Sequence, residues 1–118
     1  MWGCFALLGL AVASPAIAQQ RTPSTRQALV ELSRVIGESH ALRQACKGAG
    51  DQFWRVRMQQ LLGRDASEPA LKTQLSVAFN DGYHAAQERF PKCGKAARTE
   101  ARRIAASGKA LSETLEAP

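Results

Sequence analysis

Apolar residues recur at intervals of three or four along most of the chain, and this spacing is the feature that most limits its fold. In the clearest stretch the apolar or small positions are Leu75, Phe79, Gly82, Tyr83, Ala86 and Phe90. Because an α-helix repeats every 3.6 residues, side chains at this spacing share one face. The pattern therefore predicts helices with one buried side. Few β-branched or aromatic residues are present, which argues against a sheet.

Two helices are expected in the first half of the chain. The first carries one stripe of apolar or small residues, namely Ala28, Leu32, Val35, Ser39, Leu42 and Cys46. Gly48 or Gly50 is expected to end it in the left-handed conformation. Asp51 is the predicted N-cap of a short second helix. The shared face of that helix holds Trp54, Met58, Leu61 and Leu62.

Two longer helices are expected in the second half. Asp65 and Glu68 have capping-box spacing ahead of Pro69, which suits the first turn of a third helix. That helix should run to about Phe90, because Pro91 cannot continue it. A fourth helix is expected from Lys95, with the stripe Ala97, Ala101, Ile104, Gly108, Leu111 and Leu115, and Gly108 could split it.

The predicted fold is all-α: a small four-helix bundle forming a single domain over residues 27–116. Before it we expect a signal peptide at residues 1–18 and a flexible N-terminal tail at residues 19–26. Residues 1–18 are an apolar run too short to span a bilayer, and they end in Ala16-Ile17-Ala18, a pattern that signal peptidase accepts. A signal peptide usually begins with a basic residue, whereas the first one here is Arg21, so the natural start could lie upstream.

Cysteine usage follows from this export prediction. Cys4 could be a lipid-attachment cysteine, but such a cysteine follows the apolar run, whereas Cys4 precedes most of it. If Cys4 leaves with the signal peptide, Cys46 and Cys93 remain, and a pair in an oxidising compartment predicts a disulfide. Two buried free thiols are the alternative. The disulfide would join the end of the first helix to the beginning of the fourth.

Gly82 is unusual because it lies inside a predicted helix, where glycine costs about 1 kcal/mol relative to alanine. Close approach of another backbone, or of a large ring such as Trp54, would account for it. A groove for a bound segment is the functional alternative. Trp54, Met58, Phe79 and Gly82 are thus the predicted packing residues.

The segments "HALRQAC", "WRVRM" and "FNDGY", followed by a cysteine ten residues after Tyr83, resemble an uncharacterised family of small exported alphaproteobacterial proteins with two well-separated cysteines, a domain of unknown function. The resemblance covers most of the mature chain and implies a disulfide but no activity. Its characteristic positions are Arg43, Cys46, Trp54, Arg55, Met58, Phe79, Asn80, Gly82, Tyr83 and Cys93. The chain departs from the pattern at Phe90, where tyrosine is commoner, and at Gly94, where threonine is expected.

The sequence shows no arrangement typical of catalysis or metal binding. His40 and His84 are the only histidines, and Asp81 with His84 would give a metal only two ligands on one helix. The cysteines cannot act as nucleophiles if they are bonded, and neither a nucleophile elbow nor paired carboxylates are visible. We expect no catalytic residue, no metal site and no cofactor.

Without a predicted catalytic or metal site, binding to a partner is the function that the sequence favours. The chain carries a net charge of +6, and its basic residues gather at Arg55, Arg57 and Arg64 and at Arg98, Arg102 and Arg103. Export makes nucleic acid a poor partner, so the second group is a candidate surface for an anionic envelope component or envelope protein. A solvated arginine face is the structural alternative, and no membrane span is expected after signal cleavage.

Arg55, Asn80 and Tyr83 lie at the margin of the predicted core, where polar groups must find partners. They are expected to form a hydrogen-bonded network joining the second and third helices, or a ligand site. Three functions stay open. The first is a non-enzymatic periplasmic accessory or interaction protein in envelope assembly or maintenance. The second is a stress chaperone or buffering protein that exposes apolar surface, and the third is an envelope enzyme.

Overall fold

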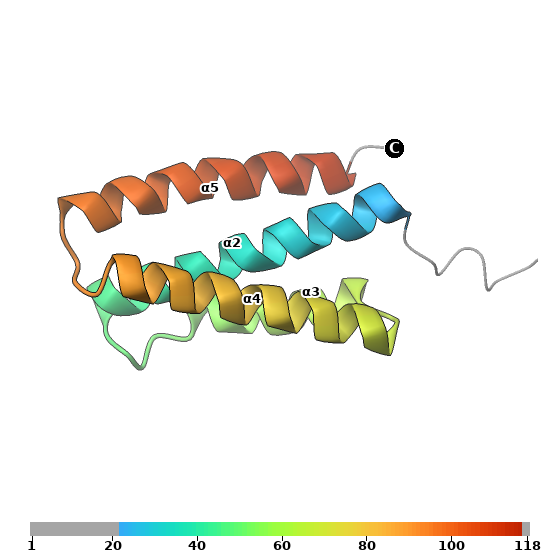
Figure 1. Cartoon of the computed structure of the whole chain (residues 1–118), viewed down its shortest axis with the longest axis horizontal. Coiled ribbons are helices and arrows are strands. Elements are labelled where there is room, and N and C mark those ends of the chain that lie inside the picture. Colours follow the sequence, from blue (N-terminus) through green and yellow to red (C-terminus); the bar gives the residue numbers. More distant parts are fainter. Residues whose placement is uncertain (1–21, 117–118) are drawn as a thin grey trace, which may run out of the picture.

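A computed structural model describes residues 22–116 and consists there of four helices and no strand (Figure 1). The helices are α2 (Pro23–Lys47), α3 (Phe53–Asp65), α4 (Pro69–Arg89) and α5 (Lys95–Glu116). The predicted all-helical bundle is confirmed. The predicted signal peptide with Cys4, and residues 19–21 of the predicted tail, lie outside the described residues.

Helix α2 begins earlier and ends where expected. Pro23 is its first residue, and the Thr22 hydroxyl accepts a hydrogen bond from the backbone N–H of Thr25 at 3.2 Å. The expected flexible tail was therefore wrong for residues 23–26, because proline is favourable in the first helical turn and Thr22 caps it. Gly48 ends the helix with a positive φ of 111°, as predicted for Gly48 or Gly50, but its ψ of 154° differs from the expected left-handed helical conformation.

The start of α3 agrees closely with the sequence, but the predicted capping box is wrong. Asp51 precedes the N-cap residue by one position, yet its carboxylate still accepts from the backbone N–H of Phe53 at 3.1 Å. Asp65 is the last residue of α3, and Glu68 makes no capping hydrogen bond to α4. Glu68 instead forms an ion pair with Arg26, whose Nη1 donates to both carboxylate oxygens at 3.2 Å. Helix α5 is continuous through Gly108.

Helix α2 is the central element of the bundle. It packs against α3, α4 and α5, whereas α3 and α4 touch over a short stretch and the backbone of α5 approaches only α2 within 8 Å. One apolar cluster joins α2 to α3 and α4 through Leu29, Ile36, Met58, Leu61, Ala66, Leu71, Leu75 and Phe79. A second joins α2 to α5 through Val35, Leu42, Ala97 and Ile104. Helix α2 is therefore buried around much of its circumference, and the single predicted stripe describes only one side of it.

A pair of glycines sets the close approach of α2 and α4. A Cβ atom added at Gly82 would lie 2.2 Å from the carbonyl oxygen of Arg34, and one added at Gly37 would lie 2.0 Å from that of Phe79. The predicted backbone approach at Gly82 is confirmed, and Trp54 is not the residue that requires it. Small residues one turn away on either side, Ser33, Ala41, Ala78 and Ala86, are all buried and extend this glycine seam.

The predicted disulfide is present between Cys46 and Cys93, whose Cα atoms are 4.7 Å apart. Both residues are exposed at the end of the bundle where α2 finishes and α5 begins. The bond encloses a chain separation of 47 residues. It fastens α5 to α2 at the end where the chain passes between α4 and α5 (Figure 1).

Candidate functional site

An open groove runs along α2 between α3 and α5. Its central part is a hollow of about 390 Å³, and two neighbouring hollows of about 240 and 290 Å³ share lining residues with it. Ser39, Trp54 and Ala105 are common to the centre and one neighbour, and Leu32 and Arg64 are common to the centre and the other. The three hollows therefore form one continuous α3–α5 groove.

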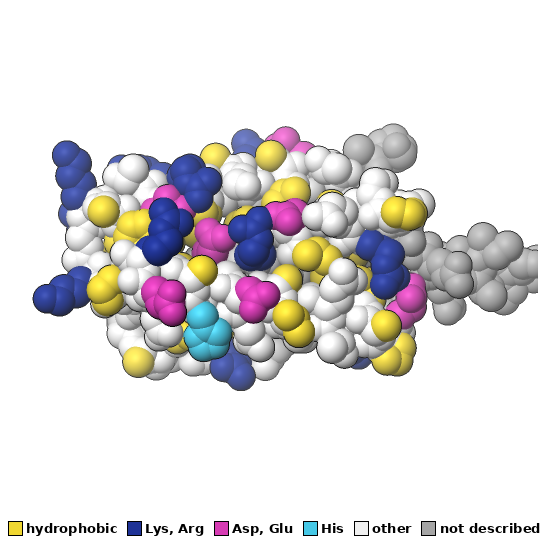
Figure 2. Space-filling view, viewed as in Figure 1, with side chains coloured by type: hydrophobic (Ala, Val, Ile, Leu, Met, Phe, Trp, Pro, Cys, Tyr) yellow, Lys and Arg dark blue, Asp and Glu magenta, His cyan; other side chains and the backbone are white. Residues whose placement is uncertain are grey.

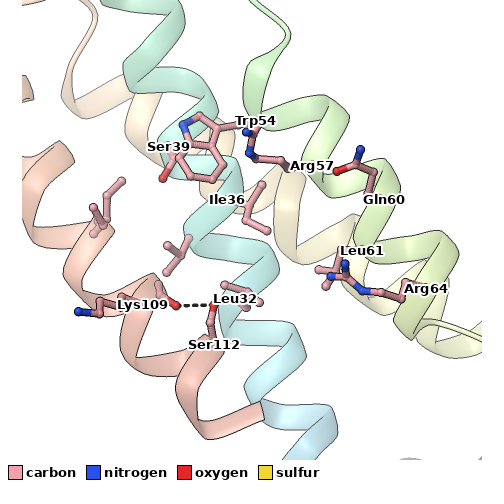
Figure 3. A pocket seen from close by; sticks show the side chains of 14 residues that line it. Leu32, Ile36, Ser39, Trp54, Arg57, Gln60, Leu61, Arg64, Lys109 and Ser112 are labelled. Carbon is pink, nitrogen blue, oxygen red and sulfur yellow. Dashed lines mark hydrogen bonds between the residues drawn. The ribbon is translucent and has the colours of Figure 1, made fainter. Parts of the chain in front are cut away.

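The groove has a mainly apolar floor and two helical walls (Figure 3). Its floor is the α2 face that contains Leu32, Val35, Ile36 and Ser39. The α3 wall consists of Trp54, Arg57, Gln60, Leu61 and Arg64, and the α5 wall of Ile104, Ala105, Gly108, Lys109 and Ser112. The α5 wall is low, because small residues occupy most of its positions toward the floor.

Ser39 is a polar residue in the floor of this groove without a hydrogen-bond partner. The residue is 9 % exposed, and its hydroxyl makes no hydrogen bond within residues 22–116. Figure 3 shows this side chain beside the indole of Trp54, which extends from α3 across α2. By contrast, the Ser33 and Ser112 hydroxyls donate to carbonyl oxygens one turn earlier, at 2.8 and 2.9 Å. Ser39 therefore retains its hydrogen-bonding capacity where the groove would hold a ligand.

Basic side chains rise along both walls. Arg57 and Arg64 stand on α3 and Lys109 on α5, and the groove continues past Arg98 toward the disulfide. Arg57 has no carboxylate partner among the described residues; it donates to the backbone oxygen of Phe53 at 3.1 Å and lies over the Phe53 ring. The acidic lining residues, Asp65 and Glu116, are confined to the opposite end. Arg64 donates to Asp65 at 3.0 Å, and Nζ of Lys109 lies 4.0 Å from a carboxylate oxygen of Glu113. The positive charge without a carboxylate partner in the described region therefore comes mainly from Arg57 and Arg98.

The predicted network of Arg55, Asn80 and Tyr83 does not form as expected. Arg55 and Asn80 are exposed and line a separate hollow of about 280 Å³ between α3 and α4, but no hydrogen bond joins the three side chains. The Tyr83 hydroxyl instead donates to Oε1 of Gln44 on α2 at 2.7 Å and accepts from Nε2 of Gln87 at 3.2 Å. The glycine seam accounts for this, because it brings Tyr83 closer to α2 than to α3. A ligand role for Arg55 and Asn80 stays a prediction.

The three arginines predicted as a partner surface differ in their surroundings. All are exposed, but Nε of Arg103 donates to both Glu100 oxygens, at 3.1 and 3.0 Å. This hydrogen bond, aided by the charge of Arg103, lowers the pKa of Glu100 although partial burial opposes the shift. Arg102 donates a hydrogen bond to the Thr99 hydroxyl at 3.3 Å and has no carboxylate partner among residues 22–116, and Arg98 lines the groove. Arg98 and Arg102 are therefore available to a partner, and Arg103 is already engaged.

His40 is a buried titratable residue that the sequence left as an ordinary histidine. It is 3 % exposed, packs against the rings of Phe79 and Tyr83, and its Nδ1 has no hydrogen-bond partner in the described part of the chain. Burial lowers the pKa of His40, the positive charge of Arg55 adds to the shift, and Asp51 opposes it. His84 is exposed, and within residues 22–116 no three histidine, cysteine, aspartate or glutamate side chains gather as a metal site would require.

The predicted packing residues fall into two groups. Met58, Phe79 and Gly82 are buried, whereas Trp54 is only half-buried and forms part of the groove. The sequence indicated Ser39 as a stripe residue but gave no reason to expect a groove there. The small residues Ala101, Ala105 and Gly108, close together on one helix, were the available signal that this wall would be low.

Comparison with other proteins gives one result. No curated protein matches the chain significantly, and no solved structure does. None of the helices within residues 22–116 is long and apolar enough to cross a bilayer. The family model DUF2385, described as a protein of unknown function, matches residues 25–117, which include the disulfide, the groove and nearly all of the four helices. The chain therefore belongs to the DUF2385 family of proteins of unknown function.

Proposed function

We propose that the protein is an exported, non-enzymatic accessory or interaction protein that serves the assembly or maintenance of the cell envelope. The observation that carries this proposal is the α3–α5 groove, a hollow along α2 where the half-buried Leu32 and Trp54 remain partly accessible above the buried Val35 and Ile36. Uncovered apolar surface rimmed by charge is characteristic of interaction sites. The groove thus gives the molecule a surface suited to holding part of another molecule.

Two observations support an extracytoplasmic location. The disulfide is consistent with an oxidising compartment, since cytosolic thiols are kept reduced. Residues 1–18 have the length and the Ala16-Ile17-Ala18 ending of a signal peptide. Export is tested by cell fractionation together with N-terminal sequencing of the mature protein, for which Gln19 is the expected first residue.

The interaction role is tested by photocrosslinking in living cells. A photoreactive residue is placed at Ala105 in the groove, at Arg102 on the outer side of α5, or at Lys72 on α4, and the adducts are identified by mass spectrometry. We expect protein adducts from Ala105. If no protein adduct forms from any of the three positions, the interaction role is wrong. Adducts from Arg102 or Lys72 alone would preserve the role and move the binding surface elsewhere.

A second candidate function, a stress chaperone or buffering protein that exposes apolar surface, is supported by His40. Protonation of this buried ring in acid would place a charge in the interior, where the positive charge of the exposed Arg55 acts against it. Mild acidification should then increase the binding of a hydrophobic dye, and His40→Leu should suppress the increase. A dye signal that does not change with pH would favour the fixed accessory protein.

A further inference from the structure

We propose that the α3–α5 groove binds one amphipathic helix of a partner protein, with acidic residues on both sides of the apolar stripe of that helix. This proposal rests on the interaction role proposed above and specifies its partner. The bound helix would lie along α2, with its apolar stripe on the floor and its acidic flanks beneath the basic walls. It would add a fifth helix to the bundle in the described region.

The dimensions of the groove suit a helix. Its lining reaches from Thr25 to Lys47 of α2, which at 1.5 Å per residue corresponds to about 33 Å, or about 20 residues of a bound helix. The α3 wall residues Trp54, Arg57, Leu61 and Arg64 recur at three- and four-residue intervals, and so do Ala97, Ala101, Ile104 and Gly108 on α5. This is the spacing with which one helix meets another. The low α5 wall would let the backbone of a bound helix come close.

Ser39 offers a hydrogen-bonding group to a ligand in the groove. The residue is nine-tenths buried, and its hydroxyl opens onto the groove without a hydrogen-bond partner among residues 22–116. A bound helix could satisfy it with a side-chain amide or carboxylate. A purely hydrocarbon ligand could not, and the polar side chains of Gln60 and Ser112 along the walls also favour a peptide over an acyl chain.

The charge of the walls selects among the possible occupants. Arg64 is paired with Asp65 and Lys109 lies near Glu113, but Arg57 on the α3 wall and Arg98 on the α5 wall have no carboxylate partner among residues 22–116. These two cations favour acidic residues on both flanks of the ligand. A second copy bound groove to groove would bring these cations together. Residues 1–21 contain no aspartate or glutamate, so they lack the required complement as well. An acidic amphipathic helix from another protein meets the requirements of both the floor and the walls.

The test uses two synthetic helical peptides of about 20 residues. Both carry leucine at every third or fourth position, with glutamate on both flanks in one peptide and lysine in the other. Binding to the full chain is measured by fluorescence anisotropy and mapped by amide chemical shifts. We expect the acidic peptide to bind at least about tenfold more tightly, to weaken with added salt, and to shift the amides of Ser39, Trp54, Ala105 and Gly108.

Matched variants localise the interaction. Ala105→Trp should fill the groove and weaken acidic-peptide binding about tenfold or more, whereas Ala106→Trp, at an exposed α5 position outside the groove lining, should change it by less than about twofold. Arg57→Gln should weaken binding and reduce its salt dependence. Arg89→Gln should not, although Arg89 also lies over an aromatic ring, that of Phe90.

Four results would overturn the proposal: equal binding of the two peptides, shifts confined to the α3–α4 hollow, equal effects of the two tryptophan variants, or a dimer that Ala105→Trp dissociates. Binding to phosphatidylglycerol vesicles that depends on Ala105, without peptide binding, would assign the groove to lipid instead. Failure here is distinguishable from failure of the interaction role. Crosslinks in cells from another surface would leave that role intact, whereas their absence from every position would refute it.

Discussion

At the scale of single residues, the packing of α2 on α4 depends on two glycines, which have no Cβ atom. Gly37 and Gly82 lie on facing helices, and each allows a carbonyl oxygen of the other helix to occupy the place of a Cβ atom. The obstacle in each case is backbone, so it cannot move aside as a flexible side chain would. The cost of glycine in a helix is thus offset by close packing of α2 on α4.

We predict that Gly82→Ala lowers the free energy of unfolding by about 1 to 3 kcal/mol, because the added methyl group collides with the carbonyl of Arg34. Gly63→Ala is the matched control. It lies in α3 with open space around it and should raise stability by about 0.5 to 1 kcal/mol. Urea unfolding monitored by circular dichroism measures both. A Gly82→Ala protein as stable as the wild type would show that the seam is looser than described.

His40 gives a prediction for pH. Its environment includes Arg55 from α3, Asp51 from the preceding loop and Tyr83 from α4, and burial together with Arg55 lowers its pKa in the folded chain. The unfolded chain, with a histidine pKa near 6.5, therefore binds the proton first. The contribution of His40 is fully present above about pH 6.5 and is lost as the pH falls toward the lower folded pKa.

Urea midpoints measured between about pH 7.5 and 5.5 should accordingly fall for the wild type and fall less for His40→Leu. His84→Gln, at an exposed histidine, should retain the wild-type slope. If His40→Leu follows the wild-type curve, other groups are responsible for any acid sensitivity.

At the scale of elements, α5 is the helix with the fewest attachments. Its backbone approaches only α2, through a small apolar cluster, and the disulfide fastens one end of it. Both cysteines are exposed, so replacing either with serine leaves no cavity. The effect of such a change therefore reflects mainly the opening of the loop that the bond closes.

We predict that Cys46→Ser, Cys93→Ser and the double variant all lose about the same stability, close to 4 kcal/mol on the chain-entropy model for a loop of this size. Equal losses are expected because each change breaks one and the same bond. Thermal unfolding of the three variants beside the chemically reduced wild type measures this. A double variant much less stable than either single variant would show that the side chains contribute separately.

At the scale of the whole molecule, charge is distributed unevenly. On the face shown in Figure 2, basic and acidic side chains are interspersed. Ion pairs such as those of the exposed Arg34 with Glu31 and Glu38 on α2 balance charge locally. The α3–α5 groove is instead lined by cations with few acids near its centre. Arg98 and Arg102 add charge without a carboxylate partner among residues 22–116.

Replacing Arg98 and Arg102 together with glutamine should weaken association with envelope fractions and reduce its salt sensitivity, since exposed charges act over about 10 Å at ordinary ionic strength. Stability should change by less than about 0.5 kcal/mol. Arg103→Gln is the control, because Arg103 is bound to Glu100 and should contribute less to a partner. Cosedimentation with envelope fractions at several salt concentrations measures the effect. If the double variant and Arg103→Gln both behave like the wild type, these arginines are solvated surface residues without a partner.

The sequence predicted the features that depend on the spacing of nearby residues. It did not predict the features that depend on how segments far apart in the chain pack together. The helices and the stop at Gly48 could be predicted from neighbouring residues alone. The Cys46–Cys93 disulfide could be predicted because two cysteines remain after the expected signal cleavage. The capping box failed because α3 continues through Asp65, and the tyrosine network failed because the glycine seam turns Tyr83 toward Gln44. The groove could not be foreseen, since it exists because α3 and α5 both pack on α2 while their backbones stay apart.

That separation of α3 and α5 has a mechanical consequence. Helices α2 and α4 are joined along the glycine seam, where two backbones interlock, so this pair is the stiff frame of the molecule. Helices α3 and α5 each pack on α2, and their backbones do not approach each other within 8 Å. A change in the tilt of α3 or of α5 would therefore alter the width of the groove without breaking the contact between α2 and α4.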